Sequence, residues 1–509
     1  MKSCLGLGIL AAAAVGIAAA PSLATAQIQM PAPQPVDAAV EKPRVVVISD
    51  IGGDPDDQQS FVRFLLYSNQ FDVEALVAVG RTPHPEAMQA QINAYAQVRP
   101  NLLLHAKGWP EPSALMSLVA AGQTTPSMVG TGENKSSDGS KLLVKAIERN
   151  DPRPLWITIW GGASTLAQAL IDLRASHSPE ETNRLISKIR VYSISDQDDA
   201  GPWIRREFPS LFYIVNPSNP GPDHYHYATW TGIAGDRFFR NGSEGADFST
   251  VTNEWLDANI RSKGPLGKLY PNYIYIMEGD TPSFLGLIDN GLNAYRRPDW
   301  GGWGGRYNFI RPYAETHPIW TSGGTLNLTG MNSQDSVVGA DGRTHVSDQA
   351  TIWRWREAFQ HDFAARINWT VSDYAHANHN PVAVVNGQTG SGVIEMAAEV
   401  GKPIVLDAGK SSDPDGQRLT YRWFHYPEAG STGARPAVMK VDGANTAKAT
   451  VTPTAACGPS PVLGRAPPPC PGGVAHIILA VTDTGTPKLT TYRRVILTVQ
   501  SDAVAAPAR

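Results

Sequence analysis

The chain has 509 residues, of which 42% are hydrophobic and 18% are charged, and its formal net charge is −4. This length predicts two or three domains, the hydrophobic content excludes a disordered chain, and the slight acidity gives no sign of a nucleic-acid-binding surface. No apolar run after residue 20 approaches the roughly 20 residues that span a bilayer, which excludes a polytopic membrane protein.

The N-terminal segment has the features of a secretory signal. Lys2 precedes an apolar, alanine-rich stretch, and Ala24-Thr25-Ala26 is an A-x-A cleavage site. Residues 1–26 are therefore predicted to be removed on export to the periplasm or the extracellular space, with a membrane anchor as the alternative. Residues 27–42 are rich in proline and are predicted to form a linker.

Two cysteines, Cys457 and Cys470, remain after removal of this signal. In an oxidising compartment, two cysteines so close in the chain favour a disulfide that closes a short loop. By the chain-entropy model such a loop contributes about 3 kcal/mol. Two free thiols are the alternative.

Strand-like and helical patterns alternate from residue 43 to residue 375. Continuous β-branched or apolar runs predict strands, and amphipathic spacing predicts the helices between them. The predicted strands are residues 44–49, 73–79, 101–104, 155–160, 189–194 and 211–215, and the predicted helices are 61–66, 85–98, 142–148 and 164–173. Such alternation predicts an open, mainly parallel sheet with helices on both faces, in which ligands bind at the carboxyl ends of the strands.

The hydrophobic pattern of the sequence is different from residue 376 to residue 509. Helical periodicity disappears, and short apolar runs are separated by glycine, proline, aspartate and serine, which predicts a small all-β sandwich. The segment SDPDG at residues 412–416, followed by LTYRWF at 419–424, resembles the turn and strand of Ig-like and PKD-like modules.

Four carboxylates lie within eight residues directly after the first predicted strand, namely Asp50, Asp54, Asp56 and Asp57. Aspartate is favoured at a helix N-terminus, so capping is the alternative. One cap needs only one aspartate, however, and four clustered negative charges repel one another without a cation. Ligands made only of oxygen suit a hard cation, Ca²⁺ or Mg²⁺.

The run VVVISDIGGDPDD at residues 45–57 resembles the N-terminal aspartate motif of the nucleoside hydrolase superfamily. The resemblance implies an open α/β sheet with a Ca²⁺ at the strand ends, bound by Asp50 and Asp57, with Asp56 as the general base. Asp54 has no counterpart in the usual motif, and it would either support the ligands or act as a further ligand.

Two later segments extend this resemblance. WGGASTLA, which begins at Trp160, is similar to the family's glycine turn, and the likeness implies that the Trp160 backbone carbonyl faces the metal. The final ligand in the family is an aspartate after a late strand. Residues 273–277 are a predicted strand, so Asp280 is the expected ligand and Glu278 the rival. Helix capping by Asp280 remains open.

Three further runs, SISDQDDAGPW at 193–203, MEGDTPSFL at 277–285 and DWGGWGGRY at 299–307, resemble a narrower branch of nucleoside hydrolase-like proteins. That branch is often labelled cellulose-binding protein-like. Its members have an export signal, a hydrolase-like domain and an Ig-like C-terminus in that order, and the resemblance covers nearly the whole mature chain.

Polar and aromatic residues near other predicted strand ends are candidates for sugar binding. Carboxylates and amides pair with diols, aromatic rings stack on sugars, and histidines protonate leaving groups. The candidates are Gln197, Asp198, Asp199, Trp203, His224 and Trp303, with Asp196, His226, Trp300 and Tyr307 nearby. The alternatives are a solvated acidic turn, a glycine-rich loop folded over its own aromatics, and surface histidines.

These features support two hypotheses. The first is a secreted, calcium-dependent hydrolase of an N-ribosyl or glycan-derived furanoside bond. Calcium would hold the sugar hydroxyls and water, Asp56 would take the proton, and the carboxylates would stabilise an oxocarbenium-like transition state. The second is a protein that binds cellulose or another plant polysaccharide through a catalytically silent domain. Both imply a nucleoside, oligosaccharide or polysaccharide partner, and neither implies nucleic acid or a membrane after export.

Overall fold

The computed structural model describes residues 36–217, 228–233, 244–274, 276–312, 314–323, 333–430, 435–459, 470 and 472–500. The predicted signal and most of the predicted linker lie outside these residues, as do His224 and His226. In the part of the chain that is described, no helix is both long and apolar enough to cross a bilayer.

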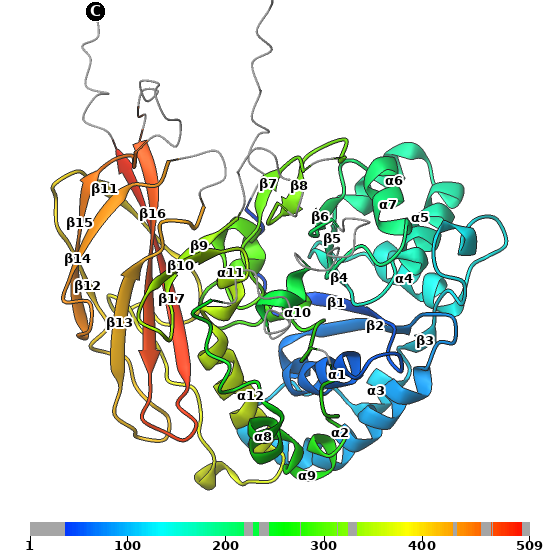
Figure 1. Ribbon diagram of the computed structural model, residues 1–509, viewed down its shortest axis with the longest axis horizontal. Coiled ribbons are helices and arrows are strands. Elements are labelled where there is room, and N and C mark those ends of the chain that lie inside the picture. Colours follow the sequence, from blue (N-terminus) through cyan, green and yellow to red (C-terminus); the bar gives the residue numbers. More distant parts are fainter. Residues whose placement is uncertain are drawn as a thin grey trace, which may run out of the picture. The chain divides into compact units, whose positions relative to one another are not determined.

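An eight-stranded sheet forms the centre of the first domain, in the order β3-β2-β1-β4-β5-β6-β8-β7 (Figure 1). All neighbouring strands are parallel except β7 and β8. The strands are β1 (Arg44–Ser49), β2 (Asp72–Ala78), β3 (Val119–Ala121), β4 (Leu155–Ile159), β5 (Ile189–Ser193), β6 (Phe212–Ile214), β7 (Asn308–Ile310) and β8 (Ile319–Thr321). This confirms the predicted mainly parallel sheet.

Helices cover both faces of the sheet, which is why β1 is an uninterrupted apolar run. Val45 and Val47 belong to one core, with side chains from α1, α2 and α12, whereas Val46 and Ile48 belong to a second core with α4, α5 and α7. The helices are α1 (Pro55–Tyr67), α2 (Pro85–His105), α3 (Pro112–Met116), α4 (Asp138–Glu148), α5 (Ser164–Ser176), α6 (Pro179–Ile186), α7 (Ala200–Glu207), α8 (Asn253–Leu256), α9 (Gly264–Gly267), α10 (Pro282–Leu285), α11 (Ala350–Trp353) and α12 (Arg356–Trp369).

Short single turns complete the first domain. They are the 3₁₀ helices η1 (Ser68–Gln70), η2 (Met128–Gly130), η3 (Thr229–Gly232), η6 (Ala294–Arg296), η7 (Pro298–Trp300) and η8 (Tyr374–His376), and the π-helix η5 (Asp257–Arg261). A separate hairpin consists of β9 (Asp335–Val338) and β10 (Thr344–Ser347).

Two predicted strands were wrong. Residues 101–104 are the last turn of α2, where Leu102 is buried while Leu103 and Leu104 are 44% and 55% exposed. A short apolar run does not distinguish a strand from a helix, and the third strand is instead β3. The described residues of 273–277 form no strand either, and they lead irregularly into Glu278.

The C-terminal part is a β-sandwich, as predicted. One sheet has the order β11-β17-β16-β13 and the other β12-β15-β14, and their facing side chains form a separate core. The strands are β11 (Ile394–Glu399), β12 (Ile404–Asp407), β13 (Thr420–His425), β14 (Val438–Asp442), β15 (Lys448–Ala455), β16 (Gly472–Thr482) and β17 (Thr490–Gln500). A disulfide joins Cys457 to Cys470.

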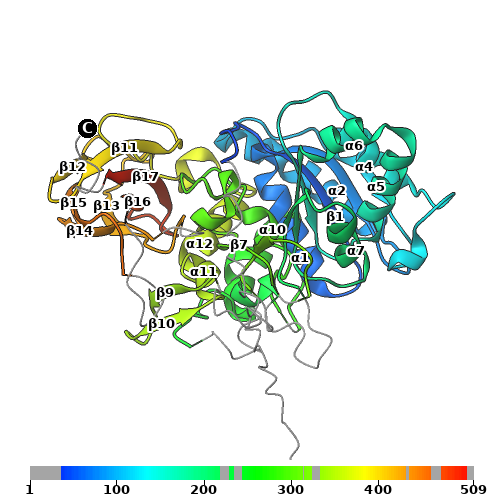
Figure 2. The same cartoon turned by 90° about the horizontal axis from the view of Figure 1, so that it is seen from above.

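Specific polar contacts connect the sandwich to the first domain. The buried Arg494 guanidinium of β17 donates to the carbonyls of Leu292 and Gly301, at 2.6 and 2.8 Å. The Tyr426 hydroxyl donates to Asp335 at 2.6 Å. Helices α11 and α12 lie between the sandwich strands and α1 (Figures 1 and 2). Hydrogen bonds therefore cross the interface between the two domains.

Candidate metal centre

The acidic residues lie at the point where the direction of the sheet reverses. Strands β1 and β4 are neighbours, but β1 leads towards β2 on one side and β4 towards β5 on the other. Chain connections therefore diverge above these two strands, and this is the usual ligand-binding position of an open α/β sheet. Asp50 directly follows β1, and Trp160 directly follows β4.

Three buried carboxylates meet at this reversal point. Asp56 and Asp57 are in the first turn of α1, and Asp280 precedes α10. One oxygen from each lies within 4.8 Å of the others, and the side chains are at most 8% exposed. We call Asp56, Asp57 and Asp280 the aspartate group. Residues far apart in the sequence thus form one compact anionic site.

The ends of β1 and α1 position two of these carboxylates. The Ser49 hydroxyl, at the end of β1, donates to Asp57 Oδ1 at 2.5 Å. Pro55 starts the helix, and the positive end of the α1 dipole favours the charge on Asp56 and Asp57. Asp54 occupies the N-cap position, but its side chain makes no capping hydrogen bond.

Burial makes this concentration of charge costly. Desolvation, followed by repulsion from Asp50 and Asp54, raises the pKa of Asp56 to about 7. Desolvation raises the pKa of Asp50 to about 6, and it raises the pKa values of Asp57 and Asp280 well above the usual range. Carboxylates in this state gain strongly from a nearby cation.

The donor set fits a hard divalent cation. Asp280 Oδ2 is buried and has no hydrogen-bond partner among the described residues. A buried acceptor is rarely left unpaired, and oxygen ligands are those that Ca²⁺ and Mg²⁺ prefer. The Trp160 carbonyl accepts from Gln197 Nε2 at 3.2 Å, and a carbonyl oxygen retains a second lone pair for another partner.

The Trp160 side chain ties two loops of the site together. Its ring is buried, and its indole N–H donates to the Ser283 hydroxyl at 2.9 Å. Ser283 Oγ in turn donates to the Asp280 carbonyl at 2.6 Å. The loop after β4 is therefore fixed to the loop that carries Asp280.

Two glycines leave the space that these carboxylates occupy. A Cβ on Gly161 would lie 2.8 Å from Asp50 Oδ1, and one on Gly279 would lie 2.5 Å from Asp56 Oδ2. Neither glycine has a positive φ. The close approach of a carboxylate, rather than backbone conformation, therefore excludes a side chain at both positions.

Gly279→Ala is expected to displace the Asp56 carboxylate, because the added methyl group overlaps it. Overpacking costs about 1–3 kcal/mol of unfolding free energy, and calcium affinity should fall as the group is disturbed. Urea unfolding and calorimetric calcium titration measure both effects. Gly286→Ala is the control, since its nearest neighbour would be 3.9 Å away. Equal behaviour of the two variants would contradict this account.

Glu278 does not belong to the aspartate group. Its carboxylate forms a 2.5 Å ion pair with Arg63 of α1, and it accepts from the hydroxyls of Tyr270 and Thr281 at 2.6 and 2.8 Å. Arg63 also donates to Gln360 and to the Phe359 carbonyl. Glu278 therefore fastens α1 to the loop of Asp280, whereas the Asp280 carboxylate lies beside those of Asp56 and Asp57.

Glu278→Gln is expected to destabilise the fold by about 3–5 kcal/mol, because it leaves a fully buried arginine without its counter-charge. Chemical unfolding of the variant measures this loss. Glu181→Gln removes an exposed partner of Arg184 and should change stability little. If both variants unfold at the same denaturant concentration as the wild type, the buried Arg63–Glu278 ion pair does not stabilise the fold.

The acidic residues after β5 that were predicted to bind sugar accept hydrogen bonds from the protein's own backbone. Asp198 accepts from the backbone N–H groups of Ser127, Ala163 and Ala200 at 3.0–3.2 Å, and Asp199 accepts from Met128 at 2.7 Å. They hold neighbouring loops in place. Gln197 is exposed and donates to the Trp160 carbonyl, which directly follows β4.

The predicted aromatic platform is not on the surface. Trp303 is 1% exposed and packs edge-on against Phe359 and Tyr492, and its neighbours Trp300 and Tyr307 are also buried. Trp203 packs against Phe208 and under Arg174. The prediction of Trp303 as a sugar contact was wrong, because the glycine-rich loop folds inward to fill the domain interface.

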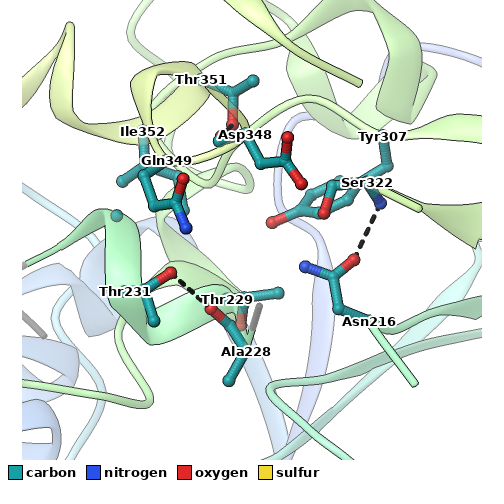
Figure 3. A pocket seen from close by; sticks show the side chains of 11 residues that line it. Asn216, Ala228, Thr229, Thr231, Tyr307, Ser322, Asp348, Gln349, Thr351 and Ile352 are labelled. Carbon is teal, nitrogen blue, oxygen red and sulfur yellow. Dashed lines mark hydrogen bonds between the residues drawn. The ribbon is translucent and has the colours of Figure 1, made fainter. Parts of the chain in front are cut away.

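A small polar cavity lies at the carboxyl ends of β6 and β8 (Figure 3). Asn216 accepts from the Ser322 N–H at 2.8 Å, and the buried Asp348 faces the same space, with its pKa raised to about 6 by desolvation. The cavity measures about 10 Å³, the size of one water molecule. It is too small for a sugar.

Three residues of the site, Ser49, Arg63 and Gly279, were not predicted from the sequence. A polar residue ending a buried strand just before an aspartate was a usable signal for Ser49. Arg63 and Gly279 act through residues far away in the sequence, Glu278 and Asp56, so no local pattern marks them.

Comparison with known proteins supports the resemblance. The nucleoside hydrolase-like domain of cellulose-binding Sde182 matches residues 44–307, and the C-terminal domain of cellulose-binding protein Sde0182 matches residues 403–499. A structure of a nucleoside hydrolase-related hypothetical protein from Saccharophagus degradans, associated with carbohydrate metabolism, is 34% identical with a TM-score of 0.71. It covers 90% of this chain and 100% of its own.

Other solved structures are more distant. The type III effector protein XopQ, solved with adenosine diphosphate ribose, is 11% identical with a TM-score of 0.32, covering 65% of this chain and 96% of its own. The PKD domain from the KIAA 1837 protein is 20% identical with a TM-score of 0.15, covering 23% and 87%. No curated protein matches. From the two family matches and the relative of 34% identity, the chain belongs to the cellulose-binding Sde182 family, with its nucleoside hydrolase-like domain and its C-terminal domain.

Proposed function

We propose that this protein is an exported, calcium-dependent hydrolase of a glycosidic bond. The observation that supports this most is the aspartate group, three buried carboxylates within 4.8 Å at the sheet's reversal point, with Asp280 Oδ2 unpartnered among the described residues. The nucleoside hydrolase-like family agrees with this chemistry, and the relative from Saccharophagus degradans is associated with carbohydrate metabolism.

Each residue of the site would have its own role in this reaction. Asp57 and Asp280 would hold the cation together with Asp50 and the Trp160 carbonyl. Calcium, when bound, supplies positive charge that orients sugar hydroxyls and makes nearby water more acidic. Asp56 would accept the proton of the attacking water. The surrounding carboxylates would stabilise positive charge that develops on the sugar ring.

A second function, glycan binding without catalysis, is supported by two observations. The family is described as cellulose-binding, and Gln197 already occupies one side of the Trp160 carbonyl. In that case the aspartate group would serve a structural cation.

The test is sugar release by the purified mature chain from a panel of nucleosides and plant-type oligosaccharides. We expect release in calcium and none after chelation. Absence of release across the panel, with calcium and glycan still bound, would favour the binding function. Release that persists unchanged after chelation would refute calcium dependence.

A further inference from the structure

A groove of about 610 Å³ runs between the two domains, apart from the aspartate group. Strands β13, β16 and β17 of the sandwich form one wall, and β9 with the start of α12 forms the other. This volume is within the range of roughly 300–1,000 Å³ typical of small-molecule sites. None of its lining residues belongs to the loops after β1 or β4.

An aromatic ring in the groove has two guanidinium groups near it. Phe424 of β13 is half-buried, with Arg422 5.3 Å and Arg354 5.8 Å from its ring centroid. Arg354 is neutralised by Asp335 at 2.8 Å. Further along the same wall, where Thr482 pairs with Thr420, Thr482 and Thr490 place their hydroxyls 2.9 Å apart on neighbouring strands. The wall thus combines a flat apolar surface with hydroxyls and positive charge.

Two of the lining cations have no counter-charge. Arg422 and Lys488 are exposed, and neither forms an ion pair with another residue in the described part of the chain. The lining carboxylates are Asp247, which accepts from the Ser249 N–H, and Glu357. An arginine in a groove without a counter-charge among the described residues is suited to a carboxylate, which its planar group can bind through two hydrogen bonds.

We propose that this groove binds an acidic glycan, an oligosaccharide with uronic acid residues. Sugar rings would pack against the exposed part of Phe424, while their carboxylates pair with Arg422 and Lys488. The choice of a glycan over an acidic peptide rests on the proposed carbohydrate function and on the ring and hydroxyls of the wall. The groove would hold a polymer on the protein independently of cleavage at the aspartate group.

The groove and the aspartate group can be tested separately, because α12 lies between them. Its residues Arg356, Glu357 and His361 line the groove, whereas Gln360 contacts Arg63, which pairs with Glu278. Substituting exposed cations at the groove therefore leaves the aspartate group intact.

Calorimetric titration of the full mature chain with an oligogalacturonate is the experiment. The Arg422→Gln/Lys488→Gln double variant is expected to bind it at least ~10-fold more weakly, since charge-assisted hydrogen bonds are lost. Lys402→Gln/Lys410→Gln removes the same charge from exposed positions of the sandwich outside the groove, and it should bind as the wild type does. A cello-oligosaccharide and poly-glutamate are the neutral and peptide comparisons, and both should bind more weakly than the oligogalacturonate.

Three results would overturn the proposal: no oligogalacturonate binding, equal loss in both double variants, or equal binding of poly-glutamate. Asp57→Asn separates the two sites. Oligogalacturonate binding that survives in Asp57→Asn but not in the groove variant supports a distinct site. Binding lost only in Asp57→Asn would place the glycan at the aspartate group and refute the groove. Hydrolysis is scored separately, so its absence leaves this test valid.

Discussion

Asp56→Asn is expected to reduce the rate of sugar release by about 10²- to 10⁴-fold, the usual contribution of a positioned general base. Asparagine keeps the shape of the side chain but accepts no proton. Asp56 is buried in the first turn of α1, so the substitution removes the base without changing the shape of the site. Steady-state kinetics on whichever panel substrate is cleaved measures the loss.

Asp54→Asn is the matched control. It removes the same charge two residues away, from an exposed carboxylate that makes no capping hydrogen bond, and it should retain most of the rate. Calcium titration of both variants completes the assignment. If Asp56→Asn abolishes calcium binding as thoroughly as Asp57→Asn does, then Asp56 is a ligand and the base must be sought elsewhere.

Calcium is expected to stabilise the protein increasingly as the pH rises from about 5 to about 8. Only ionised carboxylates bind the cation well, and burial raises the pKa values of Asp50 and Asp56 to about 6 and about 7. At a calcium concentration 100 times the dissociation constant, the gain is about 2.7 kcal/mol. Thermal unfolding with calcium or with chelator, at several pH values, measures the difference.

The chelated protein should show the opposite trend. An aspartate that titrates near 7 when folded, and near its ordinary value of 3.8 when unfolded, binds more protons in the folded state between these values. The unfolding free energy must therefore fall as the pH rises through that window. Asp57→Asn should flatten both trends, since it removes a carboxylate from the group. Calcium stabilisation that is independent of pH would contradict a site built from these aspartates.

The sequence determined the fold class because buried strands and sandwich strands have local signatures. The run from Val45 to Ile48 is apolar throughout since both faces of β1 are covered, and that pattern is readable without any partner. Asp50, Asp56 and Asp57 were equally accessible, because one strand and the next helix bring them together. The family resemblance added Asp280, whose carboxylate lies in the aspartate group, and the Trp160 carbonyl, whose role as a ligand stays a prediction.

Only the tertiary structure decided where elements distant in sequence meet. The reversal between β1 and β4, the pairing of Arg63 with Glu278 and the burial of Trp303 between the domains all depend on packing across the chain. Local periodicity records whether a residue is covered, but not which surface covers it. The apolar run at residues 101–104 therefore did not reveal that it belongs to a helix. The groove beside Phe424 likewise exists only because the sandwich meets α12.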